Sequence, residues 1–147
     1  MEKIVEIKEF SKDILLFVRN MLQQLTPEQS PQRKELTEEK FRQIVESVQT
    51  HLFVMFDENE TPVGTLSVGL YRTPSGYKAW IEDVVVDETF RGRQYGKKIV
   101  EHALNFIREA GADTIALTSN AGRIAANKLY QQSGFELYET NLYKIRL

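Results

Sequence analysis

Residues 81–100 constrain this chain most, because they join an apolar strand, a basic loop broken by glycines and an amphipathic helix in direct succession. A helix N-terminus carries partial positive charge, so each cation placed there is unfavourable by about 0.3–1 kcal/mol. Four cations nevertheless lie on or just before the first turn: Arg91, Arg93, Lys97 and Lys98. An anion held by free backbone N–H groups at this turn would reverse that cost. The pattern therefore predicts an α/β fold with a site for a phosphate-bearing ligand.

Composition narrows the possible classes of protein. The 147 residues are predicted to form one domain, 1–147, and the net charge of −2 argues against a nucleic-acid or membrane partner. The chain has no cysteine, which excludes disulfides, cysteine-ligated zinc and a cysteine nucleophile, and the sequence predicts no metal site. The N-terminus lacks an apolar leader and no apolar run could span a bilayer, so a cytoplasmic location is expected.

Hydrophobic periodicity predicts alternating strands and helices. Helices are expected after the capping residues Ser11 and Thr37, from the basic loop to Ala110, and over 123–133. The 26–36 segment, with two prolines, is predicted to be a loop. Strands are expected at 4–10, 51–56, 63–71, 77–86, 114–118, 135–138 and 142–147. This order predicts a mixed, mostly antiparallel central sheet with helices on both faces.

A second informative segment, residues 119–135, places a tyrosine on a helix one turn before the glycine that ends it. The tyrosine is Tyr130 and the glycine is Gly134. Asn120 is predicted to be the N-cap of this helix. Arg123 and Asn127 either cap the helix or lie on its exposed surface, or they contact a ligand, and the sequence leaves these interpretations open.

Together the two segments resemble the GNAT superfamily of acetyl-CoA-dependent N-acyltransferases. The pyrophosphate loop of that superfamily reads Arg/Gln-x-x-Gly-x-Gly/Ala, and here residues 91–96 read Arg-Gly-Arg-Gln-Tyr-Gly, so Gln94 departs from the usual glycine. The strand at 82–86 is similar to that of glucosamine-6-phosphate N-acetyltransferases. The segment from Arg123 to Tyr130 is more similar to aminoalkylphosphonate acetyltransferases.

The resemblance implies acetyl-CoA as acyl donor and assigns residues to it. Glycine at 92 and 96 would let the backbone approach the pyrophosphate and adopt positive φ. The pantetheine arm would lie beside the strand at Val84, Val85 and Val86. The residues expected to contact the pyrophosphate and the rest of the cofactor are Arg91, Gly92, Arg93, Gln94, Tyr95, Gly96, Lys97, Asn120, Arg123, Asn127 and Tyr130.

Three groups are expected to carry the chemistry of acyl transfer. Tyr130 would donate a proton to the leaving thiolate, and Glu82 or Asp83 would accept the ammonium proton directly or through water. A carboxylate in an apolar strand should have a raised pKa, which suits a base and favours Glu82. A backbone N–H near Val85 would stabilise the oxyanion.

The expected function is acetyl transfer to a primary amine, most simply of a small molecule, by direct attack in a ternary complex. The first helix, the 26–36 loop, Trp80 and the turn at 138–141 could line the acceptor pocket, and Arg33, Lys34 and Arg72 could bind an anionic acceptor. Three alternatives stay open: a non-catalytic acyl-CoA sensor, a protein N-acetyltransferase, and a nucleic-acid module with Tyr95 stacking on bases. A homodimer is a mild expectation from the resemblance.

Overall fold

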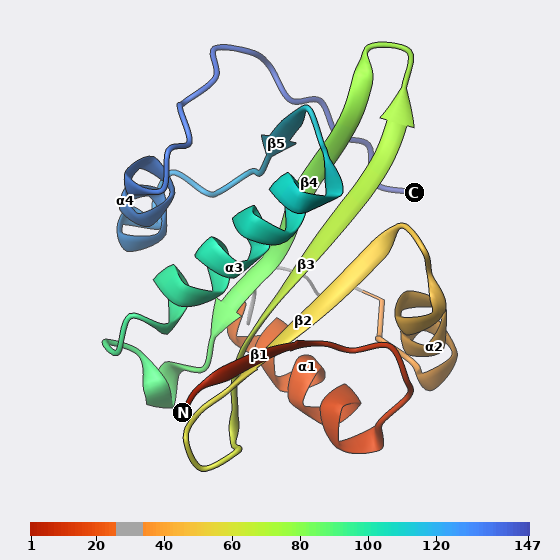
Figure 1. Cartoon of the computed structure of the whole chain (residues 1–147), viewed down its shortest axis with the longest axis vertical. Helices are drawn as coiled ribbons and strands as arrows, with labels where there is room; N and C mark the ends of the chain where they lie inside the picture. Colours follow the sequence, from red (N-terminus) through yellow and green to blue (C-terminus); the bar gives the residue numbers. More distant parts are fainter. Residues whose placement is uncertain (26–33) are drawn as a thin grey trace.

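A computed structural model describes residues 1–25 and 34–147, and its centre is a five-stranded sheet with the order β1-β2-β3-β4-β5 (Figure 1). Antiparallel pairing joins the first four strands, and β5 pairs in parallel with β4. The sheet is therefore mixed and mostly antiparallel, as predicted. The strands are β1 (Lys3–Glu6), β2 (Thr50–Phe56), β3 (Pro62–Thr73), β4 (Gly76–Val86) and β5 (Thr114–Ala116).

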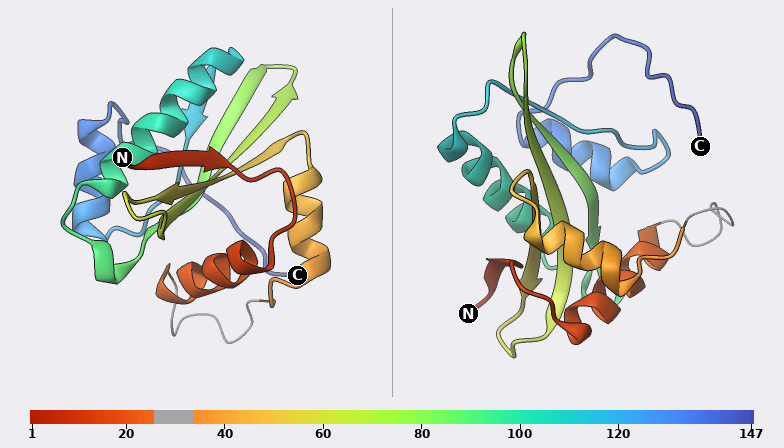
Figure 2. Two further views of the ribbon diagram at one scale, coloured as in Figure 1. Left: turned by 60° about the horizontal axis from the view of Figure 1, so that its bottom comes forward. Right: turned by 90° about the vertical axis from the view of Figure 1, so that its right-hand side faces the viewer.

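Helices cover both faces of this sheet. Helices α1 (Lys12–Leu25) and α2 (Glu38–Glu46) lie on one face, and α3 (Tyr95–Ala110) lies on the other (Figure 2). The molecule has one hydrophobic core on each face of the sheet, because successive side chains of a strand point to opposite faces. In β2, Leu52 packs with α1 and α2, while Phe53 packs with α3. A short 3-10 turn, η1 (Glu88–Phe90), precedes α3, and α4 (Ile124–Gln132) packs with the α3 side of the core.

The helix caps predicted at Ser11 and Thr37 are confirmed. Ser11 Oγ accepts a hydrogen bond from the Ile14 N–H at 3.3 Å, and Thr37 Oγ1 accepts one from Lys40 N–H at 3.2 Å. Gly111 ends α3 with φ 85°, the left-handed cap that glycine favours.

Several boundary predictions are wrong. The strand expected at 4–10 ends at Glu6, and the apolar face expected for the second helix to include Val48 stops short of it, because α2 ends at Glu46 and Val48 is 88% exposed. Asn120 is not the N-cap of α4: Arg123 holds that position, and Asn120 Oδ1 accepts from Gly122 N–H at 2.8 Å in a local turn. Most of the predicted 26–36 loop, including Arg33, lies outside the described residues.

The strands predicted at 135–138 and 142–147 are absent from the described chain. Residues 136–147 run as an extended, exposed segment, which we call the C-terminal tail. A strand forms only when its N–H and C=O groups find a neighbouring strand. Alternating sequence alone therefore could not decide whether this segment pairs.

Candidate active site

Strands β4 and β5 separate part-way along their length. They pair only from Lys78↔Thr114 to Trp80↔Ala116, while β4 continues to Val86. Within the described chain, the β5-facing edge of residues 81–86 consequently has no strand beside it. Unpaired backbone groups on such an edge can receive an extended, amide-containing ligand.

A bulge deforms β4 along this open edge. Thr65 pairs with Val85 and Ser67 pairs with Glu82, so the two residues Asp83 and Val84 oppose the single residue Leu66. Asp83 has φ 51°, a left-handed conformation that is uncommon for a residue other than glycine. A bulge bends the strand and redirects its side chains. Both Glu82 and Asp83 are exposed at this bulge, and the charge of Asp83 acts on Glu82.

The loop after β4 presents free backbone donors at the start of α3. Gln94, the N-cap, makes no side-chain capping bond, and the first intrahelical bond runs from Lys98 N–H to the Gln94 carbonyl. The N–H groups of Tyr95, Gly96 and Lys97 therefore have no partner in the helix. With no acidic residue in the first turn, this end of α3 is suited to an anion.

Left-handed residues shape the loop. Gly92 has φ 83° and Gln94 has φ 63°, so Gln94 adopts the conformation that a glycine would take there. Gly96, in contrast, is helical, and the expectation of positive φ at this position is wrong. Arg91 Nε donates to the Val86 carbonyl at 3.2 Å, which fixes the loop to the end of β4.

Three elements meet at Gly96. A Cβ added there would lie 3.5 Å from Leu129 Cδ2 of α4 and 3.8 Å from Val86 Cγ2 of β4. The end of β4, the first turn of α3 and α4 are therefore in contact at one point. This junction brings the predicted loop residues together with the helix that carries Tyr130.

Not all of the predicted cations and rings are available to a ligand. Lys98 forms an ion pair with Glu2, and Arg93 lies over the Phe90 ring at 5.5 Å from its centroid. The Tyr95 side chain is buried in the core, so only its backbone N–H can contact a ligand. The buried ring also argues against base stacking by Tyr95 in a nucleic-acid module.

Tyr130 sits in an apolar environment near the junction. Its ring is 6% exposed and contacts Phe135 edge-on at 6.1 Å between centroids. Burial raises the pKa of Tyr130, and the charge of Arg123 opposes this shift. No hydrogen bond from a described residue contributes to this shift, so the side chain is a neutral phenol.

The electrostatics of Glu82 agree with the sequence-based expectation. Desolvation raises the pKa of Glu82, the neighbouring charge of Asp83 raises it further, and Lys144 of the C-terminal tail lowers it. A carboxylate shifted in this direction is a stronger base than an ordinary glutamate.

The polar residues at the start of α4 hold the turn that precedes it. Asn127 Nδ2 donates to the carbonyls of Asn120 and Arg123, at 2.9 and 2.8 Å. Both amide protons of Asn127 are thus committed to the backbone, which leaves its Oδ1 and the Arg123 side chain for a ligand.

Comparisons with known proteins identify the family. Residues 16–135 match the model of the acetyltransferase (GNAT) family. The chain belongs to the GNAT family. An uncharacterised N-acetyltransferase of Bacillus subtilis strain 168, YhdJ, is 31% identical over 123 residues, which cover 80% of this chain and 86% of YhdJ.

Solved structures agree with this membership. The structure of glucosamine-6-phosphate N-acetyltransferase from Arabidopsis thaliana is 26% identical, with a TM-score of 0.78 over 99% of this chain and 98% of that one. A transcriptional regulator from Bacillus halodurans C-125 is 25% identical, with a TM-score of 0.80 over 99% and 100% of the two chains. This GNAT protein is therefore an acyltransferase by family, and its fold is shared along the whole chain.

Sequence reasoning gave no sign of one buried polar atom near the predicted site residues of 120–130. Ser119, between β5 and α4, has a buried Oγ with no hydrogen-bond partner among the described residues. Leaving a buried hydroxyl unsatisfied costs about 1–3 kcal/mol, so such a group is suited to a ligand. No pattern distinguishes Ser119 in the sequence. The bulge at Asp83 could not be predicted from the sequence either, although two adjacent carboxylates in an apolar strand are unusual and pointed to an irregularity there.

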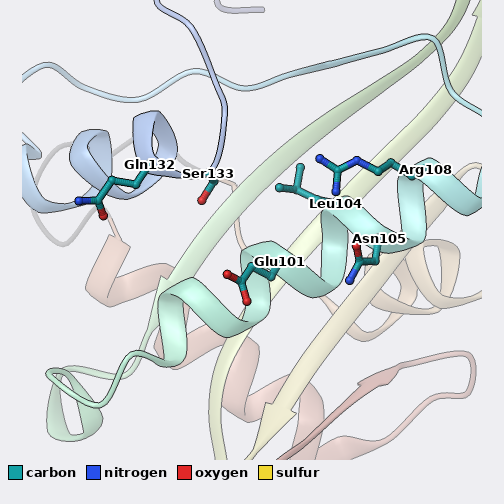
Figure 3. A pocket seen from close by; sticks show the side chains of 6 residues that line it. All are labelled: Glu101, Leu104, Asn105, Arg108, Gln132 and Ser133. Atoms are coloured by element: carbon teal, nitrogen blue, oxygen red, sulfur yellow. The ribbon is translucent and has the colours of Figure 1, made fainter.

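A hollow of about 300 Å³ lies elsewhere, between α3 and the end of α4 (Figure 3). None of the predicted site residues lines it, and it is a polar surface depression. Its lining residues are Glu101, Leu104, Asn105, Arg108, Gln132 and Ser133.

The part of the chain that the structure describes contains no cluster of three or more His, Cys, Asp or Glu side chains arranged to hold a metal. Among the same residues, no helix is both long and apolar enough to cross a membrane.

Proposed function

We propose that this GNAT protein transfers an acetyl group from acetyl-CoA to the primary amine of a small molecule. The observation that carries the proposal is the set of unpartnered N–H groups at the start of α3, directly beside the open edge of β4. A diphosphate fits the first feature, and the amide-containing pantetheine arm fits the second. Acetyl-CoA joins these two groups in one molecule.

The side chains support a direct transfer. The acceptor amine gives its proton to Glu82, or to water held by Glu82 and Asp83, and attacks the thioester carbonyl. A backbone N–H near Val85 stabilises the oxygen that becomes negative. The carbon–sulfur bond breaks, Tyr130 protonates the departing thiolate, and the phenolate regains its proton from solvent.

Gln94 does not favour the acyl-CoA sensor over the enzyme. Its backbone takes the left-handed conformation and keeps its N–H, so the usual glycine is replaced without loss of a donor. The sensor would bind the ligand at the same loop but would release no thiol.

A thiol-release assay over a panel of primary amines tests this function. With acetyl-CoA present, we expect coenzyme A to form at a rate that depends on the amine and that exceeds hydrolysis without amine. A panel of peptides with free N-termini or lysines serves as the comparison for a protein acceptor. Binding of acetyl-CoA without amine-dependent release from any acceptor would contradict the enzymatic proposal.

A further inference from the structure

One side chain in the last turn of α1, Gln24, is hydrogen-bonded to the loop that follows β4. Its carbonyl oxygen Oε1 accepts from the Glu88 N–H at 2.8 Å. Its amide nitrogen Nε2 donates to Oδ1 of Asp87 at 3.3 Å. The oxygen and the nitrogen of this amide therefore bind consecutive residues that lie 63 and 64 positions further along the chain. We call this pair of bonds the Gln24 bridge.

The bridge acts at the point where β4 ends and the loop begins. Asp87 follows the last residue of β4, and its N–H donates to the Val63 carbonyl at 2.8 Å. Its carboxylate caps η1, because Oδ1 accepts from the Thr89 N–H at 3.1 Å. The Asp87 carbonyl accepts from the Phe90 N–H at 2.9 Å. Asp87 thus sets the direction in which the loop leaves the sheet, and Gln24 holds the same carboxylate oxygen that caps η1.

The bridge crosses from one layer of the molecule to another. Helix α1 contacts β4 on the sheet face opposite α3, whereas the loop leads on to the first turn of α3 (Figure 2). A second bond, from Arg91 Nε to the Val86 carbonyl, ties the middle of the loop to β4. Two fixed points on one short loop restrict the directions in which its backbone N–H groups can point.

Hydrogen bonds matter more than packing for this segment. No residue of η1 is buried, although Phe90 packs partly against the core. The loop also holds Gln94 at a positive φ, which is uncommon for a residue other than glycine. A loop that relaxed from this conformation would have to be ordered again when a ligand binds, and that ordering weakens affinity. A loop held in advance avoids this loss.

We propose that Gln24 is a positioning residue for the diphosphate site, holding the loop between β4 and α3 from the opposite face of the sheet. The inference rests on the proposed binding of coenzyme A at the first turn of α3. Gln24 acts through Asp87 and Glu88 and needs no contact with the ligand. A substitution of Gln24 should therefore weaken binding of the phosphate part of coenzyme A and spare binding of the pantetheine part.

Calorimetric titration of the full chain with coenzyme A tests this role. Gln24→Met keeps the length of the side chain and removes both bonds, so the Kd should rise about tenfold, or about 1.4 kcal/mol, the net value of one or two hydrogen bonds. Gln24→Glu keeps the acceptor for the Glu88 N–H but places a like charge beside Asp87, and the Kd should rise as well. Gln23→Met is the matched control, because Gln23 is the exposed neighbour in α1, and it should bind as the wild type does.

A second ligand separates positioning from a general loss of structure. Pantetheine lacks the diphosphate, and its inhibition constant, measured by displacement of coenzyme A, should be the same in the wild type and in Gln24→Met. The circular-dichroism spectra should also agree. The inference alone is overturned if both Gln24 variants bind coenzyme A with wild-type affinity, or if they lose affinity for coenzyme A and pantetheine equally. A wild-type protein that binds no coenzyme A would overturn the proposed function together with the inference.

Discussion

Tyr130 and Glu82 are two ionisable side chains whose surroundings shift both pKa values upward. The shift has opposite consequences, because a tyrosine with a raised pKa keeps its proton whereas a glutamate with a raised pKa attracts one. One residue therefore stays a proton donor while the other becomes a better acceptor. Desolvation is the leading cause at both positions, so the roles proposed for the two residues rest on burial.

Tyr130→Phe tests the donor role. We expect kcat to fall about 10²-fold or more, the usual range for a general acid, with little change in the KM for acetyl-CoA. No hydrogen bond contributes to the pKa shift of Tyr130, so removal of its hydroxyl should leave the thermal stability unchanged. Tyr143→Phe removes the same group from an exposed position and should keep full activity. Wild-type turnover of the Tyr130 variant, with chemistry rate-limiting, would contradict the role.

Glu82→Gln tests the acceptor role through the pH profile. A base must be ionised to act, so kcat/KM of the wild type should decline on the acidic side around a pKa above that of ordinary glutamate. The Gln variant should lose about 10²-fold in rate and lose this acidic limb. An unchanged profile would remove Glu82 from the mechanism.

Asp83→Asn separates the two carboxylates. The charge of Asp83 raises the pKa of Glu82, so its removal should move the acidic limb to lower pH while most of the rate is kept. Loss of the rate in Asp83→Asn, with Glu82→Gln nearly active, would instead make Asp83 the base.

At the scale of elements, the site depends on two local departures from regular geometry. The loop at the start of α3 uses left-handed backbone at Gly92 and Gln94, and β4 uses a bulge at Asp83. The loop could be predicted from its glycines and cations, since these act within a few residues. The bulge could not, because it depends on the register between β4 and β3, which no local pattern reports.

Gly92→Ala tests the conformation of the loop. Its added Cβ would meet no atom within 4 Å, so the substitution acts through the positive φ alone, which costs an L-residue about 1–2 kcal/mol. If the loop relaxes from this conformation, affinity for coenzyme A should fall about 5–30-fold. Calorimetric titration measures the change.

Gly69→Ala is the matched control. Its Cβ is equally unobstructed, but its φ is not positive, so affinity should stay at the wild-type value. Equal affinities for both variants would show that the left-handed turn is not required for binding.

For the whole molecule, the sequence predicted the sheet type, the covered faces and most helix ends, because periodicity and capping are local properties. It failed where a strand needs a distant partner: the tail has a strand pattern but no strand beside it in a single chain. The prediction that Asn120 caps α4 was wrong, because its side chain accepts from Gly122 N–H in the turn before the helix, and Arg123 is the N-cap. Ser119 became visible only through its burial.

The central claim is that the first turn of α3 binds a diphosphate beside the open edge of β4, and calorimetric titration of the folded protein with coenzyme A tests it most directly. We expect one molecule bound per chain with a Kd below about 1 mM, or about −4 kcal/mol, and much weaker binding of pantetheine, which lacks the diphosphate. Absence of any heat of binding at millimolar coenzyme A would contradict the account.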